Sequence, residues 1–558
     1  MFVLPPEHSR EQLSARPSTV MVVANQEQNY QNHHQIGKHF RQSGNPLGAQ
    51  AEYRQAIREV ERLRSQLRIE QRADFLADKQ AIYEEMVELC LALEQPAQAL
   101  TYVEMIKSRT LHDLLTLQAN GWTDAESSAD HPWLATLQHL RQARDQLVGG
   151  WQEQNLGGVR GNARDQFRQP VVQRAIADFE KRITTLWHNW RARTTNYLPK
   201  TAVPMPTEAV QACLGADAAM VEYFVIQGKL VAFVITATRI HVKRLPATLA
   251  QVNQLLDFLR LNLKTVAHRA VEQTDHLIQN ATRLLKKLYD CLFAPLRDLL
   301  APYHQLIIVP HGPLHQLPFH ALYDGQTYLV EHYLISYLPR ASLLPLGKQA
   351  RPGASLGEVT TAAMFGYSAG GRLPYAVQEA QQVAMMAGGE AFLEEAATRA
   401  SLHKVAEHCR LLHVATHGNF RVDNPLFSGL ALADGWLTTL DTFELRLRAS
   451  LVTLSACQSG CHLVAGGDEL LGLIRAFLAA GAATVVAGLW AVEDQSTARL
   501  MTYFYRKLAA GATKGEALHY AQLSLLKGID QADAPDAARY RHPYFWAPFF
   551  LVGDAGLL

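Results

Sequence analysis

The chain has 558 residues, of which 48% are hydrophobic and 19% charged, and its 53 basic and 52 acidic residues give a net charge of +1. A chain of this length needs more than one hydrophobic core, so several domains are expected. The balanced charge argues against direct binding to nucleic acid or to an anionic membrane. Six scattered cysteines do not suggest a disulfide framework, and we therefore expect a cytoplasmic protein.

Residues 1–20 have no apolar stretch of signal-peptide length and are expected to form a tail. Residues 21–125 are predicted to form helical repeats. Small and bulky residues recur there at the offsets of a tetratricopeptide (TPR) repeat, in which small side chains make room for large ones. These positions are Gly37, Phe40, Ala49, Tyr53 and Ala56, with a second copy ending at Ala99, Val103 and Ile106. An ordinary helical bundle is the alternative.

Residues 126–203 are predicted to form a helical hairpin or linker. Apolar residues recur at helical spacing on both sides of a glycine-rich stretch, residues 148–166, which we expect to be a flexible loop. From residue 204 the pattern changes to a strand, a glycine turn and two further strands. Helices are expected near residues 247–264 and 271–299, and the run "HQLIIVP" predicts a buried strand.

Residues 351–558 alternate short β-rich runs with helical runs, which is typical of an α/β fold with a mostly parallel sheet between two layers of helices. The β-rich runs are "AAMFGYS", "LLHVATHG", "SLVTLSAC", "ATVVAGLWAV" and "FWAPFFLVG". The segment Leu470–Val492 has the length of a membrane span. However, Arg475 and Gly481 within it favour a helix, a turn and a buried strand, so no membrane span is expected.

Two of the predicted strands end in reactive side chains. His417 and Cys457 are 40 residues apart, which leaves room for one crossover between neighbouring parallel strands. An imidazole can take the thiol proton and later protonate a leaving amine. The N–H groups of Gly418 and Cys457 are candidates for an oxyanion hole. Either residue alone would more simply be a buried structural side chain.

Four longer motifs resemble the CHAT domain of the caspase–separase clan of cysteine peptidases, a domain commonly fused to TPR repeats. They are "HVATHGN", "LVTLSACQSG", "GGDELLGLIRAFLAAGAATVVAGLWAVEDQST" and "KGEALHYAQLSLL". The resemblance extends over about residues 204–558. It implies a multidomain chain, in which an all-α TPR-like half precedes an α/β caspase-like three-layer sandwich. Residues 204–350 would be a pseudo-caspase-like part, and residues 351–558 the catalytic part with a His417–Cys457 dyad.

The resemblance also suggests substrate-binding residues. In several clan members an acidic residue near the nucleophile selects a basic P1 side chain, whereas Ser455 is neutral and leaves this specificity open. Trp490 would line the substrate cleft, with core packing as an equal alternative. Asp494 would lie at the cleft edge, or else cap a helix. Asp434 is a further pocket candidate, although an Asp-Gly pair more often forms a hairpin turn.

His311, His315 and His320 occur within ten residues and raise the question of a metal site. Pro313 and Pro318 prevent the helix that would align two of these side chains. The same stretch also matches a structural segment of the CHAT domain. We therefore expect neither a metal nor another cofactor.

These observations lead to a functional hypothesis. The chain is expected to be a cysteine endopeptidase that cleaves a specific protein substrate, in bacterial defence or signalling. Its TPR-like region would bind an activating or regulatory protein or complex. The alternative is a catalytically inactive TPR–CHAT adaptor that acts by protein–protein binding.

Overall fold

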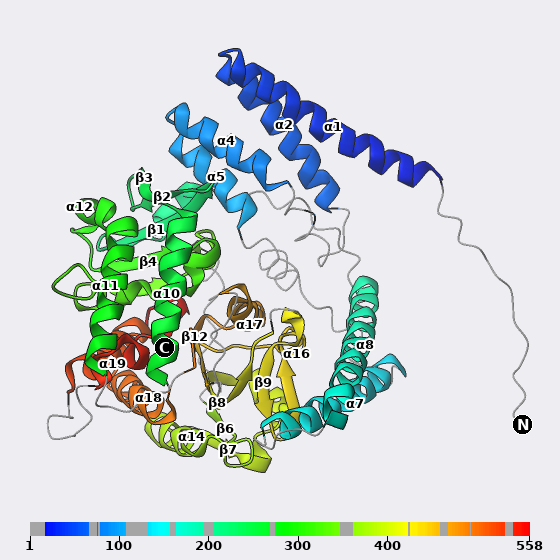
Figure 1. Cartoon of the computed structure of the whole chain (residues 1–558), viewed down its shortest axis with the longest axis vertical. Coiled ribbons are helices and arrows are strands. Elements are labelled where there is room, and N and C mark those ends of the chain that lie inside the picture. The colour runs from blue at the N-terminus through cyan, green and yellow to red at the C-terminus, as the bar shows by residue number, and fades with distance from the viewer. Residues whose placement is uncertain are drawn as a thin grey trace, which may run out of the picture. The chain divides into compact units, whose positions relative to one another are not determined.

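The computed structural model describes residues 17–65, 75, 79–107, 132–156, 163–194, 206–267, 274–345, 361–421, 424–457, 467–491, 493–529 and 539–558. Contacts between residues divide the described chain into two compact units. The first is helical and ends at Ile106, and the second begins at Lys107 and contains the β-sheet. The predicted order, an all-α region followed by an α/β fold, is confirmed (Figure 1).

The described residues of the helical unit form two helix pairs. Its helices are α1 (Pro17–Gln42), α2 (Pro46–Ser65), α4 (Gln80–Ala92) and α5 (Pro96–Ile106). Helix α1 packs along α2, and α4 packs along α5. A Cβ atom on Gly37 would lie 2.5 Å from the ring of Tyr53, so only glycine allows this close packing. Tyr53 is completely buried, as the pattern of small and large residues predicts.

A polar cluster joins the two helix pairs. Glu85 of α4 accepts a hydrogen bond from the Tyr53 hydroxyl at 2.8 Å and lies 3.1 Å from His34 Nε2 and 3.3 Å from Lys38 Nζ. Burial by itself would raise the pKa of the Glu85 carboxyl. The hydrogen bonds to His34 and Tyr53 and the charge of Lys38 outweigh burial and lower this pKa to about 2.

Over the described residues, the second unit is built on a 13-stranded sheet with the order β10-β9-β8-β11-β12-β13-β5-β4-β1-β2-β3. Outside this order, β6 pairs with β8, and β7 pairs with β6. The strands are β1 (Ala218–Ile226), β2 (Lys229–Ile235), β3 (Ile240–Thr248), β4 (Gln305–Val309), β5 (Leu334–Tyr337), β6 (Thr361–Gly366), β7 (Glu390–Leu393), β8 (Cys409–Asn419), β9 (Gly429–Leu432), β10 (Gly435–Thr438), β11 (Leu451–Cys457), β12 (Thr484–Gly488) and β13 (Phe549–Gly553).

The second unit also contains α-helices. They are α7 (Pro132–Leu156), α8 (Ala163–Thr194), α9 (Thr207–Ala212), α10 (Leu249–Ala267), α11 (Thr274–Leu292), α12 (Arg297–Leu300), α14 (Pro374–Ala387), α15 (Arg399–Ala406), α16 (Thr439–Thr442), α17 (Gly467–Ala479), α18 (Asp494–Ala509), α19 (Lys514–Lys527) and α20 (Pro543–Trp546). Among the described residues, no helix is both long and apolar enough to cross a membrane.

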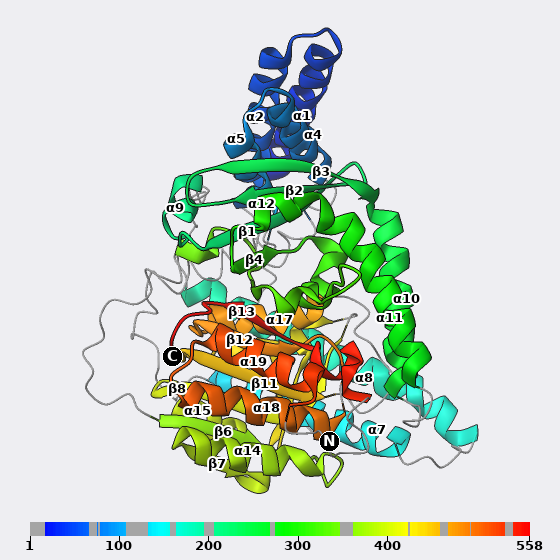
Figure 2. The ribbon, with the colours of Figure 1, turned by 90° about the vertical axis from the view of Figure 1, so that its left-hand side faces the viewer.

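The sheet has two halves that meet where β13 pairs with β5 through Val552 and Tyr337. In the second half, β7, β6, β8, β11 and β12 are all parallel, and β13 closes the half in the antiparallel direction. Helices α14, α18 and α19 cover one face of these strands, while α17 lies on the other face (Figure 1 and Figure 2). A strand that is covered on both faces has a continuous apolar sequence, and for this reason the positions of these strands can be predicted from the sequence.

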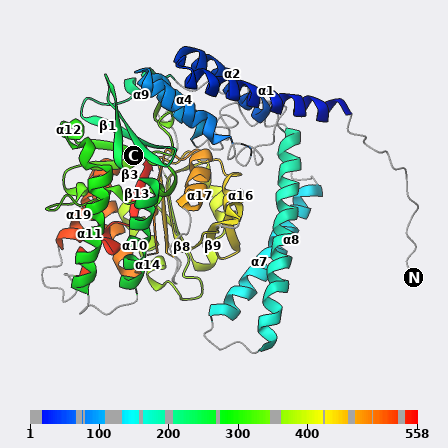
Figure 3. The ribbon, with the colours of Figure 1, turned by 45° about the horizontal axis from the view of Figure 1, so that its top comes forward.

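Helices α7 and α8 run side by side as a hairpin and belong to the same compact unit as the sheet (Figure 3). Their apolar residues pack against the second half in two clusters. One contains Leu137, Leu140, Ile183, Trp187, Phe427 and Leu440, and the other contains Val148, Ile176, Ala431 and Trp436. The predicted loop over residues 148–166 is shorter than expected, because α7 continues to Leu156 and α8 begins at Ala163.

Candidate active site

Strands β8 and β11 are parallel neighbours, and they bring the two reactive positions together. Their register runs from Leu411 opposite Leu451 to His417 opposite Cys457, the last pair of the ladder. Backbones of adjacent strands lie about 4.8 Å apart, and paired positions fall on the same face of a sheet. Residues 458–466 and the Cys457 side chain lie outside the described part of the chain.

The end of β8 leaves little space beside β11. Gly418 is buried, and a Cβ atom there would lie 2.9 Å from the Phe420 ring and 3.2 Å from the Ala456 Cβ. Gly418 also pairs with Leu430 of β9, so β8 changes its partner from β11 to β9 immediately after His417. The glycine therefore permits close approach of the two strands at the point where the candidate dyad lies.

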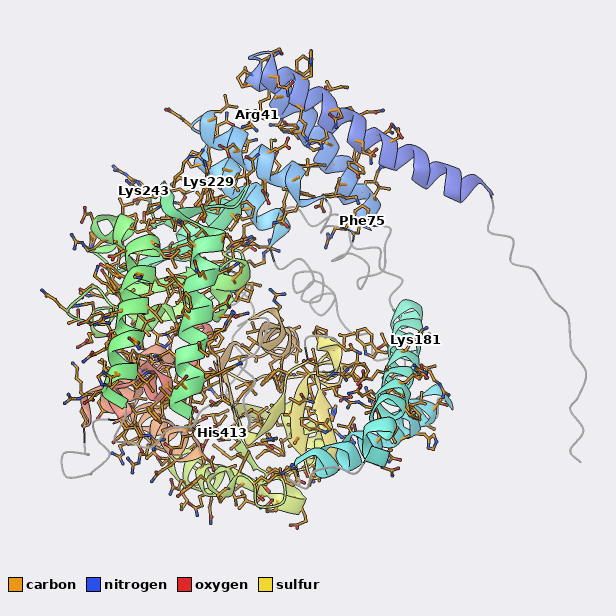
Figure 4. The ribbon with its side chains drawn as sticks, in the orientation of Figure 1. Arg41, Phe75, Lys181, Lys229, Lys243 and His413 are labelled. Carbon is orange, nitrogen blue, oxygen red and sulfur yellow. The ribbon has the colours of Figure 1, made fainter. Side chains whose placement is uncertain are left out.

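A buried polar network lies behind the His417–Cys457 pair on the same strands. His413, labelled in Figure 4, is opposite Thr453, four residues before the dyad. Its Nε2 lies 3.0 Å from the Glu379 carboxylate of α14, and its Nδ1 lies 3.0 Å from the Tyr505 hydroxyl of α18. Tyr505 in turn donates a hydrogen bond to Thr453 at 2.8 Å, and burial raises the pKa of its hydroxyl. Four elements are thus joined beneath the strand ends.

Sequence reasoning missed this network. The sequence contains one indication of the network, which is His413 inside the apolar run "LLHVATHG". Its partners Glu379 and Tyr505 belong to helices that are distant in the sequence, so the pattern does not identify them. Burying a polar group destabilises the fold unless the group is hydrogen-bonded or paired. His413 is completely buried and Glu379 almost completely, so each provides the other with a polar partner.

Asp494 lies at the first turn of α18 and connects two helices. Its Oδ2 accepts a hydrogen bond from the backbone N–H of Tyr375, at the start of α14, at 2.9 Å. Burial raises the pKa of the Asp494 carboxyl, and the nearby Glu379 adds to this effect, whereas the Tyr375 N–H opposes it. The Asp494 carboxylate therefore binds the N-terminus of α14. As a capping residue it was expected to bind its own helix, α18.

The other expected substrate residues have structural contacts. Ser455 is buried on β11, between Thr453 and Cys457. Trp490 is only 6% exposed, and its indole N–H donates to the Tyr544 carbonyl at 3.0 Å. Asp434, in the turn between β9 and β10, accepts a hydrogen bond from the Arg399 backbone N–H at 2.7 Å. Trp490 and Asp434 thus have the packing and turn contacts that were considered as alternatives.

The three histidines near residue 315 do not gather around one point. Burial lowers the pKa of His311 to about 3 and the pKa of His320 to about 4, and it lowers that of His315 as well. His320 lies 3.1 Å from the Tyr337 hydroxyl and 3.0 Å from the Ala547 carbonyl oxygen. Within the described part of the chain, no group of three or more His, Cys, Asp or Glu side chains is placed to hold a metal ion.

The helical layers, the parallel strand core and the order of the strands define this unit as a caspase-like α/β domain. Residues 282–554 match the CHAT domain, so the predicted CHAT identification is confirmed for this part of the chain. The match begins within α11 and includes β4 to β13.

Curated relatives share part of this sequence. The chain is 27% identical over 336 residues to Tetratricopeptide repeat protein 28 of Mus musculus, and 26% identical over 332 residues to the Homo sapiens protein of that name. Each alignment covers 48% of this chain but only 13% of the relative, so the chain spans a small part of these proteins.

Among solved structures, the separase–securin complex of Saccharomyces cerevisiae contains a similar chain. The similarity covers 97% of this chain and 41% of the yeast chain, with 10% sequence identity and a TM-score of 0.50. At this identity the comparison concerns the fold alone, and it agrees with the caspase-like arrangement of the sheet.

Proposed function

We propose that this protein is a cysteine endopeptidase of the caspase–separase clan, with Cys457 as the nucleophile and His417 as the acid and base. The observation that carries this proposal is the register of β8 and β11, in which His417 and Cys457 are directly paired at the ends of parallel strands. Functional residues of open parallel sheets gather at this edge. The CHAT match over residues 282–554 agrees with the proposal.

In the proposed reaction, His417 takes the thiol proton of Cys457, and the sulfur attacks the carbonyl carbon of the scissile peptide bond. The resulting oxyanion accepts hydrogen bonds from the backbone N–H groups of Gly418 and Cys457. His417 then donates its proton to the leaving amine, which departs and leaves an acyl-enzyme. A water molecule, deprotonated by His417, hydrolyses the thioester and restores the free thiol.

Helix N-termini support an ionised thiol at this edge. Helices α14, α17 and α18 follow the parallel strands β6, β11 and β12 along the chain. Each of these helices therefore begins near the edge of the sheet that is formed by the carboxyl ends of the strands, where β8 and β11 also end. The N-terminal end of a helix carries a partial positive charge, which favours nearby anions and lowers the pKa of a thiol.

We further propose that the substrate is a single protein, and that the helical unit binds a regulatory protein or complex in the cytoplasm of a bacterial cell, in defence or signalling. The two helix pairs described for this unit and the name of the mammalian relatives, a tetratricopeptide repeat protein, both support a repeat-type binding surface. Ser455 is neutral, and Trp490 and Asp434 have structural contacts, so these residues give no reason to expect a particular P1 side chain.

A peptide electrophile that reacts with thiols tests the proposal. The wild-type protein, Cys457→Ala and His417→Ala are treated with a peptidyl acyloxymethyl ketone. Cys213→Ala, which removes a half-buried thiol elsewhere in the chain, serves as the control. Peptide mapping should locate the adduct on Cys457, at a rate at least about tenfold lower in His417→Ala. Equal labelling of the wild type and Cys457→Ala would instead favour the inactive adaptor.

A further inference from the structure

The chain that follows His417 is held by a residue from far earlier in the sequence. Arg421, four residues after His417, forms an ion pair through Nη1 with Glu180 of α8. The Asn424 amide donates a hydrogen bond to the other carboxylate oxygen of Glu180 at 3.0 Å. One carboxylate thus binds two side chains between β8 and β9.

This carboxylate is deeply buried. Glu180 is 1% exposed, and the side chain of Arg144, on α7, lies 3.4 Å away and is also buried. The Arg144 guanidinium stacks over the ring of Phe427 at 5.0 Å from its centroid. A buried carboxylate must be paired to persist, and here two arginines and one amide supply its partners.

The α7–α8 hairpin, which carries Glu180, packs against the second half of the sheet. Its apolar residues form a common cluster with Phe427 and Leu440, and Arg141 binds Asp441 at 2.8 Å and Glu444 at 2.9 Å. The segment that Glu180 holds is itself closed by a hydrogen bond from the Arg421 N–H to the Ser428 hydroxyl at 2.9 Å. The hairpin lies before residues 282–554, so it adds a support that the CHAT domain itself does not contain.

We propose that Glu180 is a positioning residue for the candidate dyad. This inference rests on the proposed peptidase function. By holding Arg421 and Asn424, the carboxylate fixes the backbone that leaves β8, and with it the direction in which His417 faces Cys457. Arg144 also binds Asp145 at 2.9 Å and keeps that ion pair when the Glu180 carboxylate is lost. Arg421 and Asn424 then lose the buried anion that they share, and the segment that carries them moves.

The test compares Glu180→Gln with Asp178→Asn in the full-length chain. Both variants change a carboxylate to an amide on α8, but Asp178 is exposed. Amide hydrogen exchange is measured for peptides that contain Arg421 or Asn424, together with the pH dependence of Cys457 labelling by the peptidyl electrophile. We expect Glu180→Gln to increase exchange of these peptides several-fold, to slow labelling about tenfold to a hundredfold, and to alter its pH profile. Asp178→Asn should match the wild type.

Unchanged exchange in Glu180→Gln, or increased exchange with wild-type labelling, would overturn the positioning role while leaving the peptidase proposal intact. A wild type that is not labelled at Cys457 would overturn both. If Glu180→Gln does not fold, Asn424→Ala removes one of the two contacts and is measured in the same way. Normal labelling in that variant, with exchange increased at Arg421, would again contradict the proposal.

Discussion

His417 and Cys457 are the last residue pair of two parallel strands that are hydrogen-bonded neighbours. This register determines whether a dyad can form, because a slip by one residue would move one of the two positions to the opposite face of the sheet. The pair His413 and Thr453, earlier in the same ladder, is connected through Tyr505 and so holds the register. The geometry of the candidate site is therefore a consequence of strand pairing.

The first prediction concerns the spacing of these strands. Gly418→Ala should slow labelling of Cys457 at least about tenfold, because the new Cβ atom would lie 3.2 Å from the Ala456 Cβ and 2.9 Å from the Phe420 ring. The rate is measured with the peptidyl electrophile. Phe420→Ala removes the ring contact, so the double variant should recover part of the rate. An unchanged rate in Gly418→Ala would show that strand spacing does not limit reactivity.

The second prediction concerns the buried network. Tyr505→Phe deletes the hydroxyl that joins His413 to Thr453, which leaves both with an unsatisfied buried group. We expect a loss of stability of about 1–3 kcal/mol, measured as a lower unfolding temperature of the sheet-containing unit by calorimetry. Tyr520→Phe on α19 is the matched control, because that ring is only half-buried. Equal effects of the two variants would contradict the network.

The sequence predicts the parallel strand core because each strand is a continuous apolar run, and it predicts the candidate dyad because two of these runs end in His417 and Cys457. It does not predict the length of α7. Gly149 and Gly150 suggested a loop, but a glycine costs a helix only about 1 kcal/mol. Burial of Val148 against Ala431 and Trp436 supplies a non-local stabilisation that offsets the cost of the two glycines, about 2 kcal/mol together.

The polar contacts of Glu180 and Asp494 could not be predicted from the sequence, because they also depend on non-local packing. Glu180 and Arg421 are 241 residues apart, and neither occurs in a motif that suggests the other. Asp494 lies in the first turn of α18, as a capping residue would, but it binds the Tyr375 N–H of another helix. Which polar groups become buried partners depends on tertiary packing, and a periodic pattern does not contain that information.

The third prediction concerns a buried ion pair at the start of the second unit. Lys107 Nζ lies 3.1 Å from the carboxylate of Glu222, in the middle of β1, and 3.3 Å from the carbonyl oxygen of Val309, at the end of β4. Lys107→Met should cost about 3–5 kcal/mol, because it leaves the completely buried Glu222 without its cation. The unfolding temperature of the full chain measures this loss.

Lys107→Met/Glu222→Leu is the matched double variant. It removes both charges and should recover most of the lost stability, since apolar residues of similar size often replace a buried ion pair at little cost. If the double variant loses as much stability as the two single variants together, the two side chains are not energetically coupled, and the ion pair does not contribute to stability.

The last prediction is a pH dependence of the helical unit. The pKa of Glu85 is lowered in the folded state from 4.5 to about 2, so the folded state favours the ionised carboxylate. Its contribution to stability is therefore complete above pH 4.5 and is lost as the pH falls from 4.5 towards 2, by about 3 kcal/mol in total. Glu85→Gln, which does not titrate, should lower the unfolding temperature of this unit near pH 7 and converge with the wild type near pH 2. A constant difference between the two proteins across this range would show that the cluster of Glu85, His34, Tyr53 and Lys38 does not stabilise the ionised form.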